Sequence, residues 1–539
     1  MNSSPPVLKH LPVARPVVMG RNGMVSSGHH LASLSGVKVL QEGGNAVDAA
    51  LAASFVLAVV RPQACGVGGD LFSLVLMKEK GRVEALNASG PAPQRATVEL
   101  FKDKGLPQIP SDGPLSIAVP GIVDGWMELH SKYGTMELTR LAADAIGYAR
   151  DGFPVYRTLL ESISELAPFY PWVDRSYRRP LDPPVPGSYL VQGELARTLE
   201  QIVNKGRESF YQGEIGARMC AALQKEGGII SQEDLAGRHA EWTDPITTTY
   251  RDFSLFEQPP VSQGFIVLEM LNIIEGYPLP SINPVDDIHV MVEAKKLAFE
   301  DRINHLEDPR FGDPGIPLLI SKEHARNRRG LISDIARTRE HLSGSFGSDT
   351  TYLCTADRDG NVVSLIQSIF AHFGSRIVAG DTGVVMNNRL SSFNLNPGKA
   401  NALIPGKRPA HTLNSYLVLR NGEFFAVGGT PGADDQPQTN VQVLHHLLDR
   451  QVSPQAAIEL PRWSHRPGTS PTLVDVPEEL RVEEGIPPDV VKGLVAKGHN
   501  VQIVNRWSFG DAAAIVRDPL TGTWMGGADP RRESYAIGW

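Results

Sequence analysis

Thr350 is the first residue whose setting suggests chemistry. It begins an apolar stretch, residues 350–356, directly after a polar segment, residues 343–349, with the composition of an exposed, cleavable loop. A cut before Thr350 would leave this residue with a hydroxyl nucleophile and a free α-amine to act as its base. An α-amine titrates near about pH 8, so part of it is neutral at working pH and accepts the hydroxyl proton. The pattern predicts an N-terminal threonine nucleophile.

No conventional catalytic motif stands out beside it. We find no convincing G-x-S-x-G elbow, HExxH zinc pair or S-x-x-K nucleophile. The adjacent histidine pairs 29–30 and 445–446 point to different sides of any regular element, so we expect no shared metal site there. One rival remains: a serine or cysteine hydrolase that uses Ser348 or Cys354 without processing. No base is expected near Cys354, and a small buried thiol is the simpler interpretation.

Ser368 is expected to face Thr350 across a β-hairpin. Residues 350–356 and 362–370 have strand character and flank a turn at residues 357–361. A three-residue loop with Gly360 in the left-handed position pairs Asp357 with Asn361. The same register sets Thr350 opposite Ser368, whose hydroxyl would orient the nucleophile or its amine. A two-residue loop would shift the register by one and break this pairing.

A bend that supplies backbone N–H groups is the other part that amide cleavage needs. Residues 428–433 read Gly-Gly-Thr-Pro-Gly-Ala after an apolar strand, so Gly432 and Ala433 could form an oxyanion hole. A Pro-Gly step can also be a plain turn, and that alternative stays open.

Composition and sequence pattern indicate the class of protein and the secondary structure around these residues. The chain has 539 residues, 41% of them hydrophobic, and a net charge of -8. The apolar content excludes overall disorder, and the net negative charge argues against binding to nucleic acid or to an anionic membrane. Residues 120–345 look mostly helical, and residues 49–60 look like a buried helix too short to span a membrane. Three distant cysteines and a proline-rich start without a signal core predict a soluble, cytoplasmic protein.

The chain resembles the gamma-glutamyltransferase family of N-terminal nucleophile hydrolases over nearly its whole length. The motifs that carry the resemblance are residues 43–50, 68–70, Pro120-Gly121, Pro259-Pro260 with Gly264, residues 349–351, 359–361, Phe373-Gly374, Gly383 with Asn387-Asn388, residues 407–409 and Pro431-Gly432.

This resemblance implies an α/β (α+β) fold, a four-layer αββα sandwich, made by autocatalytic cleavage of a zymogen between Asp349 and Thr350. Residues 1–349 would form a large subunit and residues 350–539 a small one, together one structural unit. Thr350 matches the family nucleophile, and Ser368 matches a threonine that hydrogen-bonds it. Gly432 and Ala433 match the paired oxyanion glycines. No metal or organic cofactor is needed, and a dimer of these heterodimers is left open.

The substrate pocket departs from the family pattern. Ser89 and Ser392 stand where the resemblance implies an arginine and an aspartate that hold the glutamyl head group, and Phe370 replaces an asparagine. Each missing polar partner of a zwitterion costs about 1–3 kcal/mol, so gamma-glutamyl transfer is disfavoured. Arg389 replaces a glutamine, and a guanidinium suits a carboxylate.

We therefore predict a threonine amidohydrolase or acylase for a small acidic acyl substrate. Arg389 would hold the substrate, with help from His411 or Thr412, which replace two serines. A structural salt bridge is the alternative role for Arg389. The alternatives for the whole protein are a glutathione hydrolase or gamma-glutamyltransferase, an inactive binding scaffold, and a relative that cleaves a carbon–carbon bond.

Overall fold

The computed structural model describes residues 8–170, 173, 176–177, 185–237, 239–338, 350–469 and 476–539. Asp349, Ser348 and the polar segment 343–349 lie outside the described residues. None of the described helices is both long and apolar enough to cross a membrane.

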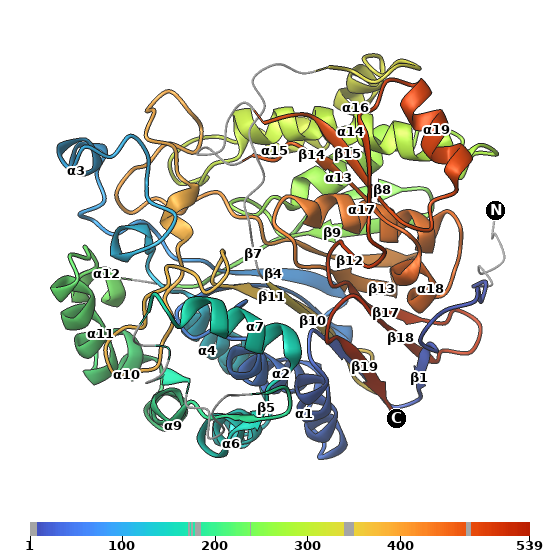
Figure 1. The fold of residues 1–539 in the computed structure, drawn as a ribbon. Coiled ribbons are helices and arrows are strands. Elements are labelled where there is room, and N and C mark those ends of the chain that lie inside the picture. The colour runs from blue at the N-terminus through green and yellow to red at the C-terminus, as the bar shows by residue number, and fades with distance from the viewer. Residues whose placement is uncertain are drawn as a thin grey trace.

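Two seven-stranded sheets, each antiparallel throughout, form the centre of the molecule (Figure 1). The first sheet runs β19-β2-β10-β11-β3-β4-β7 and the second runs β1-β18-β17-β13-β12-β9-β8. The strands of the first sheet are β19 (Tyr535–Gly538), β2 (Met24–Ser27), β10 (Thr351–Ala356), β11 (Val362–Ser368), β3 (Asp70–Met77), β4 (Arg82–Ala88) and β7 (Glu241–Thr243). Those of the second are β1 (Val18–Gly20), β18 (Trp524–Ala528), β17 (Ala513–Arg517), β13 (Glu423–Gly429), β12 (Ser415–Arg420), β9 (Phe253–Glu257) and β8 (Ile246–Tyr250).

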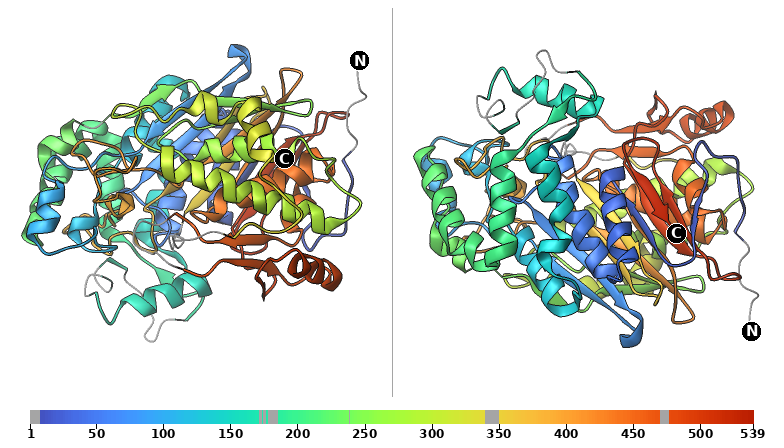
Figure 2. Two further views of the ribbon diagram at one scale, coloured as in Figure 1. Left: turned by 90° about the horizontal axis from the view of Figure 1, so that it is seen from above. Right: turned by 90° about the horizontal axis from the view of Figure 1, so that it is seen from below.

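Helices cover the outer face of each sheet, as Figures 1 and 2 show. A buried core that includes Phe55 and Trp126 joins the first sheet to its helices, and a second core that includes Phe265 and Leu444 does so for the other sheet. A third core, with Phe72, lies between the sheets. The four-layer αββα sandwich expected from the resemblance is therefore confirmed. The helices on the first sheet are α1 (His30–Gln41), α2 (Ala46–Val60), α4 (Ile122–Tyr133), α6 (Ala143–Asp151), α7 (Arg157–Leu166) and α9 (Gly193–Lys205), and those on the second are α13 (Gly264–Ile274), α14 (Pro284–His305), α17 (Asp435–Leu448) and α18 (Pro454–Glu459).

Smaller elements complete the described chain. They are α3 (Val98–Asp103), α5 (Leu138–Leu141), α10 (Arg207–Tyr211), α11 (Glu214–Lys225), α12 (Gln232–Ala236), α15 (Ile316–Leu319), α16 (Lys322–Arg329), α19 (Pro488–Ala496), the pair β5 (Phe153–Pro154) and β6 (Tyr189–Leu190), the three-stranded sheet β14 (Trp463–Arg466), β15 (Glu479–Glu483) and β16 (Val501–Val504), and three short 3₁₀ turns, η1 (Lys78–Lys80), η2 (Pro114–Ser116) and η3 (Arg389–Ser392).

Helix α2 is buried along its whole length, as its composition predicted. It starts in a capping box, in which Asn45 accepts from the Asp48 N–H and the Asp48 carboxylate accepts from the Asn45 N–H. The strands β8 and β9 were missed, because the prediction for residues 120–345 was mostly helical. In β8 half-buried residues alternate with exposed ones, and in β9 buried residues alternate with half-buried ones. Each pattern covers only five positions, which is a weak signal within a long, mostly helical stretch.

The β10–β11 hairpin has the predicted register. Ladder partners run from Thr351↔Gln367 to Ala356↔Val362. The turn is closed by the Asp357 N–H, which donates to the Asn361 carbonyl at 3.1 Å, and Gly360 has a φ of 91°. The Asp357 carboxylate fixes the loop further by accepting from the N–H groups of Asp359 and Asn361. Local turn chemistry therefore sets which residues face each other at the far end.

Candidate active site

Thr350 and Ser368 meet at the open end of this hairpin. The Thr350 hydroxyl donates to the Ser368 hydroxyl oxygen across 3.1 Å, and both residues are fully buried. The Ser368 oxygen also accepts from the Phe370 N–H at 2.8 Å. The predicted juxtaposition of the two residues is confirmed, and the serine is held in place by the backbone that follows β11.

The nucleophile candidate faces the space between the two sheets. Side chains alternate along a strand, so Thr350 shares its face with Tyr352 and Cys354, both part of the core between the sheets. Gly429 at the end of β13 lies against the Tyr352 ring, where a Cβ would come within 2.7 Å. The loop that follows β13 is thereby held over the end of β10.

Gly432 and Ala433 lie in that loop, just before α17. Their φ angles are 129° and 49°, and their carbonyls accept from the N–H groups of Asp435 and Gln436 at 2.8 and 3.2 Å. Gln263 holds the bend by donating to the Ala433 carbonyl at 3.0 Å. Neither the N–H of Gly432 nor that of Ala433 donates to another described residue. The bend thus leaves two adjacent donors available to an oxyanion.

A charged group lies one strand beyond Ser368, centred on Asp70. Asp70 pairs with Ser368 in the β11–β3 ladder. Its carboxylate lies 3.0 Å from His411 Nε2, accepts from the Gly90 N–H at 3.0 Å, and lies 3.7 Å from Arg389 Nε. Asp70, Arg389 and His411 are all fully buried. We call these three residues the Asp70 cluster.

Arg389 has hydrogen-bond donors that no other member of this cluster accepts. Its Nη1 donates to the Thr412 hydroxyl at 3.3 Å, and its guanidinium carbon lies 4.0 Å from the centre of the Phe370 ring. Neither Nε nor Nη2 has a hydrogen-bond partner among the described residues. Burial lowers the pKa of Arg389 to about 9, with Asp70 opposing the shift, so the side chain stays charged at neutral pH.

His411 is neutral in the same setting. Burial and then the Arg389 charge lower its pKa to about 4, against the pull of Asp70. The contact with Asp70 assigns the proton to Nε2, which leaves Nδ1 as an acceptor without a partner in the described chain. The cluster therefore offers a free cationic donor and a free neutral acceptor.

The structure brings together the three residues expected at the substrate, Arg389, His411 and Thr412. Arg389 also forms an ion pair with Asp70, which agrees with the alternative that Arg389 has a structural role. Asp70 was missed as a functional residue, since residues 68–70 entered the sequence analysis only as one motif of the family resemblance. Cys354, the rival nucleophile, is fully buried, and burial raises its pKa, which keeps the thiol protonated and unreactive.

The family model for gamma-glutamyltranspeptidase matches residues 32–539. The chain belongs to the gamma-glutamyltranspeptidase family. It is 39% identical over 529 residues to a glutathione hydrolase-like YwrD proenzyme of Bacillus subtilis (strain 168), covering 97% of this chain and 99% of the relative. It is 34% identical to the oxamate amidohydrolase proenzyme of Klebsiella pneumoniae subsp. pneumoniae, covering 96% of this chain and 98% of the relative.

Solved structures of this family share the fold. A cephalosporin acylase from Bacillus halodurans superimposes with a TM-score of 0.90 at 36% identity, covering 100% of this chain and 99% of the other. The chain is thus a divergent gamma-glutamyltranspeptidase family member whose relatives include acylases and amidohydrolases. It is an enzyme that acts on amide bonds.

Proposed function

We propose that the protein is a self-processing threonine amidohydrolase that acts on an amide of a small acidic acyl group. Cleavage between Asp349 and Thr350 divides the precursor into a large subunit, residues 1–349, and a small subunit, residues 350–539. The observation that carries the proposal is the buried hydroxyl pair of Thr350 and Ser368 at the head of β10, which lies beside the Asp70 cluster. Proenzyme relatives support a precursor that is cut.

In the proposed reaction, the nucleophile, the base and the oxyanion donors all come from the chain itself. The Thr350 hydroxyl oxygen attacks the substrate carbonyl carbon while the freed α-amine accepts its proton. The N–H groups of Gly432 and Ala433 stabilise the oxyanion that forms. The amine then returns its proton to the leaving nitrogen, the C–N bond breaks, and an acyl ester remains on Thr350. Water activated by the same amine hydrolyses the ester and restores the hydroxyl.

Arg389 selects the acyl group by its charge. Neighbouring strands lie about 4.8 Å apart, so Asp70 is about 10 Å from Thr350 across β11. In this proposal a short acyl chain with a terminal carboxylate extends from Thr350 toward the Asp70 cluster, where Nη2 of Arg389 has no hydrogen-bond partner among the described residues. Such a pair is a charge-assisted hydrogen bond in a buried site, which makes it strong and selective. The names of the oxamate amidohydrolase and cephalosporin acylase relatives agree with non-glutamyl substrates.

A gamma-glutamyl head group lacks its partners here. The Ser89 hydroxyl donates to Asn87 at 2.7 Å, and the Ser392 hydroxyl donates to the Arg389 carbonyl at 2.9 Å. Both hydroxyls are therefore engaged within the protein and carry no charge. We expect glutathione to be a poor substrate.

Intact mass of the purified protein tests the mechanism before any substrate is tried. The wild type should appear as two fragments divided at Asp349–Thr350, and Thr350→Ala as one uncut chain. Thr355→Val is the matched control, because Thr355 lies on the same strand and bonds the Ala46 carbonyl away from the site; it should be cut like the wild type. A wild type that remains one chain after long incubation would contradict the proposal. Small acidic amides can then be screened against the processed enzyme.

A further inference from the structure

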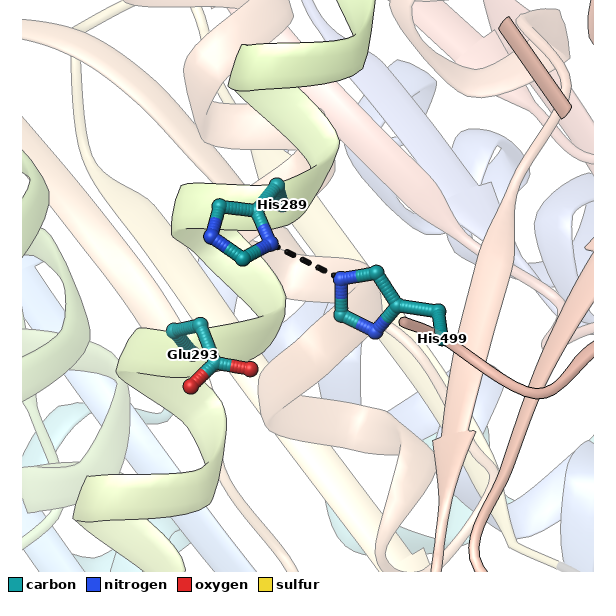
Figure 3. Close-up of side chains that lie close together, drawn as sticks. All are labelled: His289, Glu293 and His499. Atoms are coloured by element: carbon teal, nitrogen blue, oxygen red, sulfur yellow. Dashed lines mark hydrogen bonds between the residues drawn. The ribbon is translucent and has the colours of Figure 1, made fainter. Parts of the chain in front are cut away.

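Two histidines and a glutamate meet in a group separate from the Asp70 cluster (Figure 3). His289 and Glu293 lie one turn apart on α14, and His499 lies in the connection between α19 and β16. Four-residue spacing places His289 and Glu293 on the same helix face. All three are buried, and one ligand atom from each lies within 4.8 Å of the others. None of the three takes part in the proposed reaction.

The proton positions leave one lone pair aimed into this group. His289 Nε2 lies 2.7 Å from the Ser333 carbonyl, an acceptor only, so Nε2 carries the proton and Nδ1 presents a lone pair. That Nδ1 lies 2.9 Å from His499 Nε2. A histidine whose outer N–H donates to a backbone carbonyl has the orientation typical of a metal ligand. His499 needs only to carry its proton on Nδ1 for both imidazoles to present lone pairs.

Glu293 supplies the negative charge. Its carboxylate is fully buried, and it accepts from the Arg337 N–H at 3.2 Å. Lys296 Nζ lies 2.8 Å from this carboxylate and is the competing cation. The same Nζ also lies 2.8 Å from Glu478 and donates to the Arg337 carbonyl at 2.7 Å. Lys296 therefore keeps two partners when Glu293 turns an oxygen toward a metal.

We propose that His289 Nδ1, His499 Nε2 and the Glu293 carboxylate bind one Zn²⁺ ion. Two imidazoles and a carboxylate are a donor set that Zn²⁺ prefers, at about 2.0–2.2 Å per bond, with water in the fourth position. Binding replaces the proton shared between the two histidines, which moves to His499 Nδ1, and Glu293 exchanges its contact with Lys296 for the ion.

The site would join parts of the chain that are far apart in sequence. His289 and Glu293 belong to the proposed large subunit and His499 to the small one. Ser333 and Arg337, bonded to His289 and Glu293, precede the proposed cleavage point by fewer than 20 residues. This role as a link between subunits depends on the proposed processing. Zinc binding itself does not.

Zinc alone is the probe for the test. Full-length protein is treated with EDTA, dialysed, and titrated with Zn²⁺ in equilibrium dialysis, while thermal unfolding is followed with and without the metal. His289→Gln and His499→Gln remove one ligand each. His305→Gln is the control, because His305 is an exposed histidine at the end of the same helix.

The wild type and His305→Gln should bind one Zn²⁺ per chain and unfold at a higher temperature with the metal. His289→Gln and His499→Gln should bind at least about tenfold more weakly and lose the thermal shift. A wild type that binds no zinc, or ligand variants that bind as tightly as the control, would overturn the site. Intact mass of the same samples reports processing separately, so an uncut chain that binds zinc would reject the proposed cleavage and leave the metal site standing.

Discussion

Ser368 lies directly opposite Asp70 in the β11–β3 ladder, while its hydroxyl oxygen accepts the hydrogen bond of Thr350. A single residue therefore connects the nucleophile on one side with the Asp70 cluster on the other. Thr350 directly precedes β10, and Ser368 and Asp70 belong to the neighbouring strands β11 and β3; all three residues are fully buried. Counted outward from Thr350, the row presents the Ser368 hydroxyl first and the Asp70 carboxylate next.

Removal of the Ser368 hydroxyl should slow both processing and turnover. Ser368→Ala leaves the Thr350 hydroxyl and the Phe370 N–H without their shared partner. The loss of about 1–3 kcal/mol corresponds to a fall in rate of about 5- to 150-fold. Ser368→Thr keeps the hydroxyl and should restore most of the rate. Cleavage half-time and kcat measure the effect, and an unchanged half-time in Ser368→Ala would show that the contact has no role.

Arg389 should control both substrate affinity and the protonation of His411. Burial and the Arg389 charge lower the pKa of His411 to about 4, so Arg389→Gln should raise this pKa. Imidazole NMR shifts should show no His411 titration above about pH 5 in the wild type and a higher midpoint in the variant.

The same variant should raise KM for an acidic amide at least about tenfold, because its carboxylate loses the free Nη2. The matched control is a substrate of similar size without the carboxylate, for which KM should change little. Equal changes in KM for both substrates would indicate that Arg389 has only a structural role.

The hairpin was predicted from its turn residues, and Arg389 and His411 were predicted as substrate-binding residues, whereas Asp70, the acid at the centre of their cluster, was not. The pairing of Thr350 with Ser368 lies within a span of 19 residues, and turn residues 357–361 determine the register of the two strands. Asp70 and His411 are 341 positions apart, and no local pattern states that they touch. The contact between the proposed zinc ligands His289 and His499 could not be predicted for the same reason, since these residues are 210 positions apart. Contacts set by local turn chemistry were therefore predictable, but the contacts of Asp70 with His411 and of His289 with His499, which depend on tertiary folding, were not.

Gly432 should be intolerant of a side chain for reasons of backbone shape. Its φ of 129° lies where L side chains are strained, at a cost of about 1–3 kcal/mol. Gly432→Ala should lower the acylation rate along with stability, because relaxation of the bend moves the N–H groups. Gly422→Ala is the control: its φ is 79°, a Cβ there meets nothing within 4 Å, and it lies in the β12–β13 turn. This control should lose stability only. Equal kcat in the two variants would argue against an oxyanion role.

Glu269 should make the protein less stable as pH rises. It is fully buried on α13, with His324 Nε2 3.5 Å from its carboxylate and Asp301 in the same group, and burial raises its pKa to about 8 against the opposing effect of His324. The folded state therefore holds a proton between about pH 4.5, the ordinary value, and about pH 8, where the unfolded state has lost it. The unfolding equilibrium constant therefore rises by up to about tenfold per pH unit across this window, and the protein becomes less stable.

Glu269→Gln keeps a neutral side chain at this position. It should flatten the dependence of stability on pH and raise stability at pH 8, whereas Glu226→Gln, at an exposed position, should change neither quantity. Urea unfolding at pH 5, 6, 7 and 8 measures the slopes, and a Glu269→Gln slope equal to that of the wild type would place the pKa of Glu269 near its ordinary value.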